Sequence, residues 1–379
     1  MQKPSHSLSD RPKCTILVVD DTEVNIELME AMLGNMYHIV IAYDGKTALR
    51  IVESVKPELI LLDVMMPDMD GYEVCRRLKA NEMTQHIPVI FITALSGEED
   101  ETKGFKLGAV DYITKPFKPI IVKTRVRNQL DLKRHRDKLE ELVKERTREL
   151  ALTQEATFES LATLAEYRDP ETGGHIRRTQ YYIKILAERL QRHPRFHNVL
   201  DEETIELLRK SAPLHDIGKV GVPDHILLKH GKLTPAEFDE MKKHTVYGRD
   251  AIQVAVEKIG STSFLRLAQE LIYSHHEKWD GSGYPEGLRG EMIPMPGRLM
   301  AIVDVYDALI SKRVYKPPFS HEKAIRIIIN DRGIHFDPDV VDAFLELQET
   351  FREIALQNMD YEEERVLLSQ GLDAERSQK

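Results

Sequence analysis

The chain has few cysteines and no long apolar run, and these two absences exclude several classes of protein. Its two cysteines, Cys14 and Cys75, form no disulfide or metal-ligand pattern, so we expect a protein of the reducing cytoplasm. No apolar run approaches the ~20 residues that span a bilayer. The polar first residues, MQKPSHSLSDRPK, do not fit a signal peptide. The net charge of −10 and the lack of a basic helix-turn-helix segment argue against binding to nucleic acid.

The length of 379 residues exceeds one typical core, which predicts at least two domains. We expect a disordered leader at 1–12, a first domain at 13–125, a connector at 126–157, a second domain at 158–350 and a charged C-terminal helix and tail at 351–379.

Five short apolar runs alternate with amphipathic segments in the first domain, at 15–19, 38–42, 59–62, 89–92 and 111–114. This alternation predicts a doubly wound α/β domain with a five-stranded parallel sheet, whose polar site lies where the strands end. The residues at those ends are Asp20, Asp21, Asp63, Thr93 and Lys115. Three converging carboxylates would repel one another without a divalent cation, and ligands that are all oxygen favour Mg²⁺.

These residues, with the run Asp63-Val-Met-Met-Pro-Asp-Met-Asp-Gly71, resemble the receiver domain of two-component response regulators. The resemblance implies that a cognate sensor histidine kinase leads to phosphorylation of Asp63. It also implies Mg²⁺ held by Asp21, Asp63 and the Met65 carbonyl with Asp20 acting through water, a switch pair of Thr93 and Tyr112, and phosphoryl binding by Lys115. In this family the Lys115–Pro116 peptide is cis. The alternative is a flavodoxin-like domain whose acids are surface charges.

The connector lies in a segment, 122–165, that contains neither glycine nor proline, and this predicts one long helix. Residues at heptad-like intervals, interrupted by Arg146, indicate a parallel coiled coil and hence a homodimer. They are Leu132, Leu139, Val143, Leu150 and Thr157. The alternative is a single solvated helix.

The second domain reads as all-α, with helices expected at 158–167, 175–191, 203–211, 235–243, 247–258, 265–275, 298–311 and 321–330. Its candidate metal ligands stand in five separate places: Glu171 with His175, His215-Asp216, His244, His275-His276, and Asp304. Five imidazoles and three carboxylates exceed the four ligands of one zinc ion, so we expect two or three ions. Imidazole mixed with carboxylate favours Fe or Mn. The remaining histidines of this domain, such as His193, His197, His225, His230 and His321, are expected to be structural or exposed.

Asp216 has two oxygens and is the natural bridging ligand between two ions, while Lys219 lies one turn past His215 and can neutralise phosphate charge. The pair His215-Asp216 and the run 275–285 resemble the HD-GYP subgroup of the HD metal-dependent phosphohydrolases. The resemblance implies that all eight candidate residues bind Fe or Mn. It implies further that Lys219, Asp307, Arg313 and Lys316 contact the substrate. Two short segments, 308–311 and 313–316, depart from the family pattern at positions that are not ligands.

The family resemblance also implies hydrolysis of cyclic di-GMP to pGpG, and often onward to GMP. The loop Gly283-Tyr284-Pro285 would contact guanine or recruit GGDEF diguanylate cyclases. We therefore expect a response regulator in which phosphorylation of Asp63 controls metal-dependent hydrolysis of cyclic di-GMP and lowers this second messenger. Two alternatives are a phospho-regulated interaction module that acts through the GYP loop and a phosphohydrolase that prefers pGpG.

Overall fold

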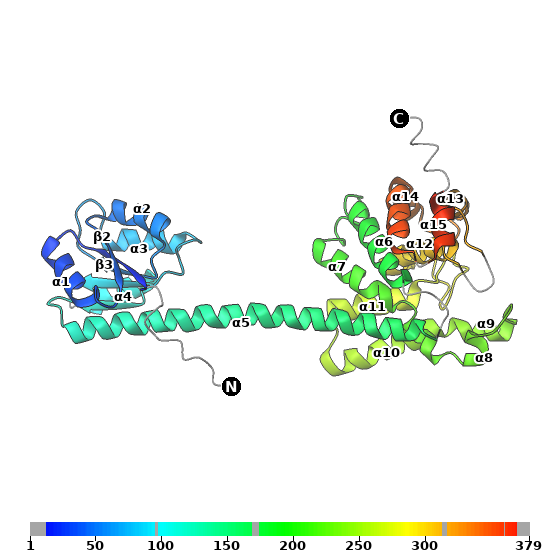
Figure 1. Ribbon diagram of the computed structural model, residues 1–379, viewed down its shortest axis with the longest axis horizontal. Helices are drawn as coiled ribbons and strands as arrows, with labels where there is room; N and C mark the ends of the chain where they lie inside the picture. The colour runs from blue at the N-terminus through cyan, green and yellow to red at the C-terminus, as the bar shows by residue number, and fades with distance from the viewer. Residues whose placement is uncertain (1–12, 95–97, 169–173, 313–316, 360, 370–379) are drawn as a thin grey trace, which may run out of the picture. The chain divides into compact units, whose positions relative to one another are not determined.

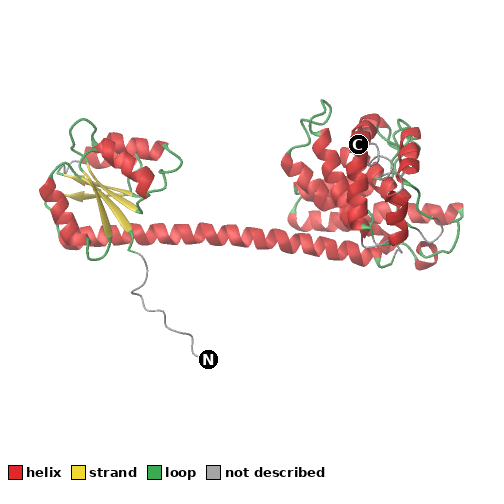
Figure 2. Ribbon diagram, turned by 45° about the horizontal axis from the view of Figure 1, so that its top comes forward, coloured by secondary structure: helices red, strands yellow, loops and turns green. Residues whose placement is uncertain are grey.

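The structure is a computed structural model that describes residues 13–94, 98–168, 174–312, 317–359 and 361–369. It divides into two compact units, 1–148 and 149–379, and the boundary falls within one long helix, α5 (Pro119–Glu166). The first unit contains strands and helices, whereas the second is helical (Figure 2). Among the described residues, none of the helices combines the length and apolar character required to cross a bilayer.

The first unit, coloured blue to cyan in Figure 1, contains the expected five-stranded parallel sheet. Its strand order is β2-β1-β3-β4-β5. The strands are β1 (Thr15–Val19), β2 (His38–Ala42), β3 (Leu59–Asp63), β4 (Val89–Thr93) and β5 (Asp111–Thr114). The helices between them are α1 (Glu23–Leu33), α2 (Gly45–Val55), α3 (Gly71–Ala80) and α4 (Glu98–Lys106). The strand order reverses between β1 and β3, and the crevice at such a point is where open α/β sheets bind ligands.

The two faces of this sheet are buried in separate apolar clusters. Leu17 and Val19 of β1 belong to the cluster that includes residues of α2 and α3. Ile16 and Val18 point to the other face and join residues of α1 and the first turns of α5. Successive strand residues alternate between faces. A strand covered on both faces therefore needs an unbroken apolar run, and β1, β3 and β4 each contain one of four residues.

The connector forms one helix, and α5 runs for 48 residues. Leu132, Leu139, Val143 and Leu150 are 61%, 62%, 64% and 70% exposed on it. Apolar side chains that stay in water do not stabilise an isolated helix. Burial of these four side chains against another surface would stabilise it. The predicted coiled coil would supply one and remains a prediction.

The second unit packs its helices around one large apolar core. Its helices are α6 (Gly174–Leu190), α7 (Glu202–Ser211), α8 (Asp224–Leu227), α9 (Pro235–Lys242), α10 (His244–Ile259), α11 (Ser263–Ser274), α12 (Met295–Ile310), α13 (His321–Asn330), α14 (Pro338–Asn358) and α15 (Glu362–Ser369). An aromatic cluster of Tyr182, Tyr306, Phe344 and Phe351 joins α6, α12 and α14 at the centre.

The segment 351–379 was predicted as a charged C-terminal helix and tail; its described part is helical and packs into the large core. Phe351, Ala355, Met359 and Leu368 are buried members of the large core. The carboxylate of Glu364 is also buried and accepts the backbone N–H of Lys312, just after α12. The second domain therefore extends to the end of α15. The acidic residues of 351–369 alternate with its apolar positions in the sequence, and the apolar pattern was therefore not recognised.

Candidate metal centres

The pair His215-Asp216 lies between two short 3₁₀ helices, η1 (Ala212–Leu214) and η2 (Ile217–Gly221). Leu214 packs in a small apolar cluster with residues of α11. At Gly218 the backbone of η2 touches the start of α10, and a Cβ there would lie 1.9 Å from the carbonyl oxygen of His244. Glycine at this position therefore lets Asp216 approach His244.

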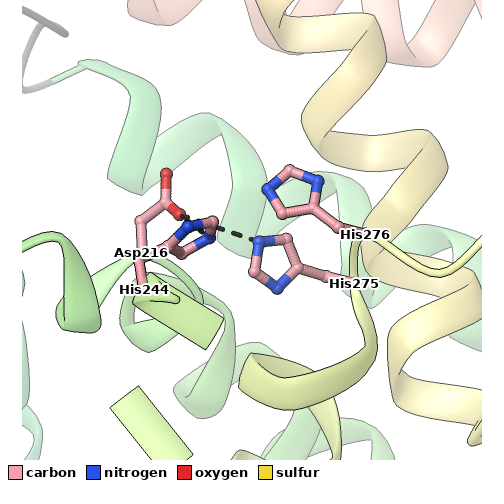
Figure 3. A group of neighbouring side chains, drawn as sticks. All are labelled: Asp216, His244, His275 and His276. Atoms are coloured by element: carbon pink, nitrogen blue, oxygen red, sulfur yellow. Dashed lines mark ion pairs between the residues drawn. The ribbon is translucent and has the colours of Figure 1, made fainter. Parts of the chain in front are cut away.

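Four of the candidate ligands form one group: Asp216, His244, His275 and His276 (Figure 3). The Oδ1 atom of Asp216 lies 3.3 Å from Nε2 of His244 and 3.7 Å from Nε2 of His275. His244 begins α10, while His275 and His276 directly follow α11, so residues about 30 and 60 positions after Asp216 meet it in space.

A second group lies beside the first and consists of His175 on α6, His215 and Asp304 on α12. Nε2 of His215 lies 3.3 Å from Nε2 of His175 and 3.8 Å from the carboxylate of Asp304. It also lies 3.5 Å from Oδ2 of Asp216, which belongs to the first group. The adjacent residues His215 and Asp216 thus connect the two groups.

Hydrogen bonds fix which nitrogen of each imidazole faces the centre. The Nδ1 atoms of His215, His244 and His275 lie 2.8–2.9 Å from the carbonyl oxygens of Ala212, Met241 and Ile272. Since a carbonyl only accepts, each Nδ1 carries the proton and each Nε2 presents a lone pair.

This arrangement is unfavourable without a cation. The buried atoms that lack a hydrogen-bond partner in the described residues include three at this centre: Asp216 Oδ1, His244 Nε2 and His275 Nε2. The Nε2 atoms of His175 and His215 lie 3.3 Å apart. Buried acceptors without donors are costly. The residues present therefore fit metal ions that accept these lone pairs.

The ionisation of the groups also suits metal binding. Burial lowers the pKa of His215 and His276, and it lowers that of His244 to about 4, so these imidazoles are neutral at pH 7. Burial acts to raise the pKa of Asp216, but Lys219 and the histidines outweigh it and hold this pKa well below its usual value. The ammonium of Lys219 lies 2.6 Å from Oδ2 of Asp216. Neutral imidazoles and an ionised carboxylate are the forms that bind metals.

Asp307, which the family resemblance assigns to a substrate contact, lies buried beside the second ligand group. It is 1% exposed, and its oxygens accept hydrogen bonds from the guanidinium of Arg178 at 2.6 and 2.8 Å. One of these oxygens also lies 2.7 Å from Nδ1 of His175. Burial acts to raise the pKa of Asp307, but Arg178 outweighs it and keeps the carboxyl ionised. Asp307 therefore orients His175, in the manner of a carboxylate behind a metal-bound histidine.

The loop that carries Gly283, Tyr284 and Pro285 is tied down by Glu277. The carboxylate of this buried residue accepts the backbone N–H groups of Glu286, Gly287 and Leu288 at 2.8–3.2 Å. A Cβ at Gly283 would lie 2.3 Å from the backbone nitrogen of Lys278, so the loop folds closely back on itself. The Tyr284–Pro285 peptide is cis. These contacts place the Tyr284 ring 4.8 Å from that of His276, at the first ligand group.

The first unit has a separate group of acids at the expected edge of its sheet. Asp20, Asp21 and Asp63 lie together at the ends of β1 and β3. The ammonium of Lys115 lies 3.1 Å from Asp20 and 3.0 Å from Asp63. Burial raises the pKa of Asp63 although Lys115 opposes this.

The other residues that were predicted for this edge lie on or just after the strands β3, β4 and β5. Thr93 ends β4 and is buried, and Tyr112 lies on the neighbouring strand β5. Met65 follows β3, two residues after Asp63, and the Lys115–Pro116 peptide is cis. The edge can hold a divalent cation on oxygen ligands next to a carboxylate and a lysine.

Three expected site residues, Glu171, Arg313 and Lys316, lie outside the described residues. Two functional residues were missed from the sequence, Arg178 and Glu277. Arg178 was detectable as a cation one turn after His175 on an apolar helix face. Glu277 directly follows His275-His276, but no spacing rule reveals an acid that binds backbone groups nine to eleven residues ahead.

Comparisons with known proteins agree with this division of the chain. Residues 159–340 match the HD domain, and residues 16–127 match the response regulator receiver domain. A probable cyclic di-GMP phosphodiesterase of Vibrio cholerae is 49% identical over 97% of this chain and 85% of its own length. The cyclic di-GMP phosphodiesterase response regulator RpfG of Xanthomonas campestris is 33% identical over 87% of this chain and 86% of its own. A 3'3'-cGAMP-specific phosphodiesterase 2 of Vibrio cholerae is 39% identical, over 51% of this chain and 34% of its own.

Proposed function

The chain belongs to the family of response regulators that join a receiver domain to an HD domain, and we propose that it hydrolyses cyclic di-GMP under the control of phosphorylation at Asp63. The observation that carries the proposal is the pair of adjacent ligand groups joined at His215 and Asp216, where Asp216 Oδ1, His244 Nε2 and His275 Nε2 are buried without a hydrogen-bond partner. Two neighbouring ions suit the hydrolysis of a phosphodiester.

The proposed roles follow from position. Asp216, His244, His275 and His276 would hold one ion, and His175, His215 and Asp304 the other, with Asp216 able to bridge them. Bound ions would activate a water molecule and bind phosphate oxygens. Lys219, beside Asp216, would neutralise the charge that develops on the phosphate, and Asp307 would keep the proton of His175 on Nδ1.

We further assign the domain to the HD-GYP subgroup, with Fe or Mn as its metal, because the ligand set mixes imidazole with carboxylate and lacks thiolate. A third ion would use Glu171. The product would be pGpG and then GMP, with Arg313 and Lys316 as further substrate contacts. A reducing cytoplasmic location suits the two free cysteines, Cys14 and Cys75, which are both buried.

Removal of the metal should stop the reaction. We expect anaerobically purified protein to hydrolyse cyclic di-GMP, EDTA treatment followed by desalting to abolish turnover, and added Fe²⁺ or Mn²⁺ to restore it. The assay is chromatography of the nucleotides alongside elemental analysis. Hydrolysis that persists in protein shown to be free of metal would refute the proposal.

For the receiver domain, we propose that Mg²⁺ and phosphorylation at Asp63 act on the enzyme through α5 in a homodimer. The exposed apolar stripe of Leu132, Leu139, Val143 and Leu150 would form the seam between the two copies. A change in the register or rotation of the paired helices could then reach the second domain. GGDEF diguanylate cyclases remain a further expected partner, through Tyr284.

Sedimentation tests this dimer. The chain should sediment as a dimer in the presence of beryllofluoride, a phosphoryl mimic, and the double variant Leu139→Glu/Val143→Glu should sediment as a monomer because charge cannot be buried in the seam. Asp63→Asn, which lacks the carboxylate, is the control for effects of beryllofluoride. A monomer both with and without the mimic would rule out the dimer.

A further inference from the structure

A short helix next to the first ligand group carries an aromatic side chain that the core does not use. Helix α9 contributes no buried residue. It is held by a capping box at Thr234 and by an ion pair between Glu237 and Lys229. Phe238 on this helix is 45% exposed. The fold alone does not account for a large apolar ring that is half in water, because its burial would stabilise the protein.

The Phe238 ring adjoins the loop that reaches the metal ligands. Its centroid lies 6.2 Å from that of Tyr284, and the two planes meet at 83°. Tyr284 in turn lies 4.8 Å from His276, a member of the first ligand group. An edge-to-face contact covers at most one face of one ring, and Phe238 stays 45% exposed, so aromatic surface remains open to a flat ligand.

The side chain of Lys242 lies beside the rings of both Phe238 and Tyr284. The ammonium of Lys242 lies 4.9 Å from the centroid of the Phe238 ring and 5.8 Å from that of Tyr284. It is paired with Asp239, a partially solvated acid on the same helix, at 2.8 Å. Lys242 lies one helical turn after Phe238, so both side chains project from the same face of α9.

From these contacts we infer that Phe238 and Lys242 form a guanine-binding corner beside the metal centre, and that Lys242 selects guanine over adenine. The inference rests on the proposed hydrolysis of a cyclic dinucleotide. One ribose separates a purine from its phosphate. If the phosphate lies at the metal ligands, the purine lies a short distance beyond them, and Phe238 is separated from the ligand His276 by the single ring of Tyr284. Aromatic rings stack on any base.

The proposed preference for guanine over adenine comes from the hydrogen-bond donors of the Lys242 ammonium. Guanine presents two acceptors, O6 and N7, on one edge, whereas adenine presents a donor amino group in place of O6. An ammonium has three donors and no acceptor, so it can pair with the guanine edge but not with the adenine amino group. This assigns to α9 a preference for cyclic dinucleotides that carry guanine over cyclic di-AMP.

The test measures kcat and KM for cyclic di-GMP, 3'3'-cGAMP and cyclic di-AMP, and for bis(p-nitrophenyl) phosphate as a phosphodiester without a purine. Phe238→Ala should raise KM for cyclic di-GMP about tenfold, the effect of losing one stacked base. Phe238→Tyr, which keeps a ring, should stay close to the parent protein. Lys242→Met should reduce the preference for cyclic di-GMP over cyclic di-AMP about tenfold, and Lys242→Arg should retain it. All four variants should keep their metal content and their turnover of bis(p-nitrophenyl) phosphate.

The outcomes separate this inference from the proposed function. Unchanged KM and base preference in Phe238→Ala and Lys242→Met, in a parent that hydrolyses cyclic di-GMP, would overturn the guanine corner alone. An equal loss of turnover on all substrates together with lost metal would show a structural role for α9 and also overturn it. A parent that binds metal and hydrolyses bis(p-nitrophenyl) phosphate but none of the cyclic dinucleotides would overturn the proposed function and this inference with it.

Discussion

Replacing Asp216 with alanine is expected to abolish turnover of cyclic di-GMP. Its carboxylate lies within 4 Å of the Nε2 atoms of His215, His244 and His275, and it pairs with Lys219. Loss of a single oxyanion-hole donor already costs about 10²–10³ in kcat. Loss of the Asp216 carboxylate should reduce kcat by at least as much, because each of the two proposed ions would lose a ligand.

The matched control is Asp250→Ala. Asp250 is an exposed acid on α10 that pairs only with the neighbouring Arg249 among the interactions found in the described residues. Elemental analysis should show a loss of metal in Asp216→Ala and none in Asp250→Ala, while both variants keep their helical circular dichroism. An Asp216→Ala protein that retains metal and turns over cyclic di-GMP at the parent rate would contradict the assignment.

The second large effect is expected at the buried pair of Asp307 and Arg178. Asp307→Leu would leave the guanidinium of Arg178 without its partner in a dry interior, which costs about 3–5 kcal/mol of unfolding free energy. His175 would lose the acceptor for its Nδ1 proton, and such a loss lowers metal affinity by about 10–100-fold.

A double variant separates these two effects. In Asp307→Leu/Arg178→Met neither charge is buried, so most of the unfolding free energy should return. His175 still lacks its acceptor, so metal affinity and turnover should stay low. Urea unfolding and metal titration of the single and double variants measure both quantities. If the double variant regained metal affinity along with stability, the pair would serve the fold and not the metal centre.

The receiver domain could be predicted closely because its elements are specified locally. The run 59–62 was expected as a strand, and β3 spans Leu59–Asp63. A strand buried on both faces needs an unbroken apolar run, and such a run is visible in one sequence. The polar residues at its end then lie at the sheet edge by topology alone.

The helical domain could be predicted less completely because its site depends on packing between distant elements. Seven of the eight expected ligands do converge, and polar residues within apolar segments, such as Asp304, were the signal. Their division into two groups depends on the tautomers and on the crossing of η2 with α10, which no spacing encodes. Asp307 is chemically like Asp304 and lies one turn further along α12, yet it faces Arg178.

The central claim is that the two ligand groups joined at His215 and Asp216 form a metal centre that cleaves cyclic di-GMP. The most direct measurement is chromatography of the products from cyclic di-GMP incubated with anaerobically purified protein whose iron and manganese content is measured in the same sample. The claim predicts at least two ions per chain and the appearance of pGpG, followed by GMP. Protein that carries its metal ions but leaves cyclic di-GMP intact would contradict it.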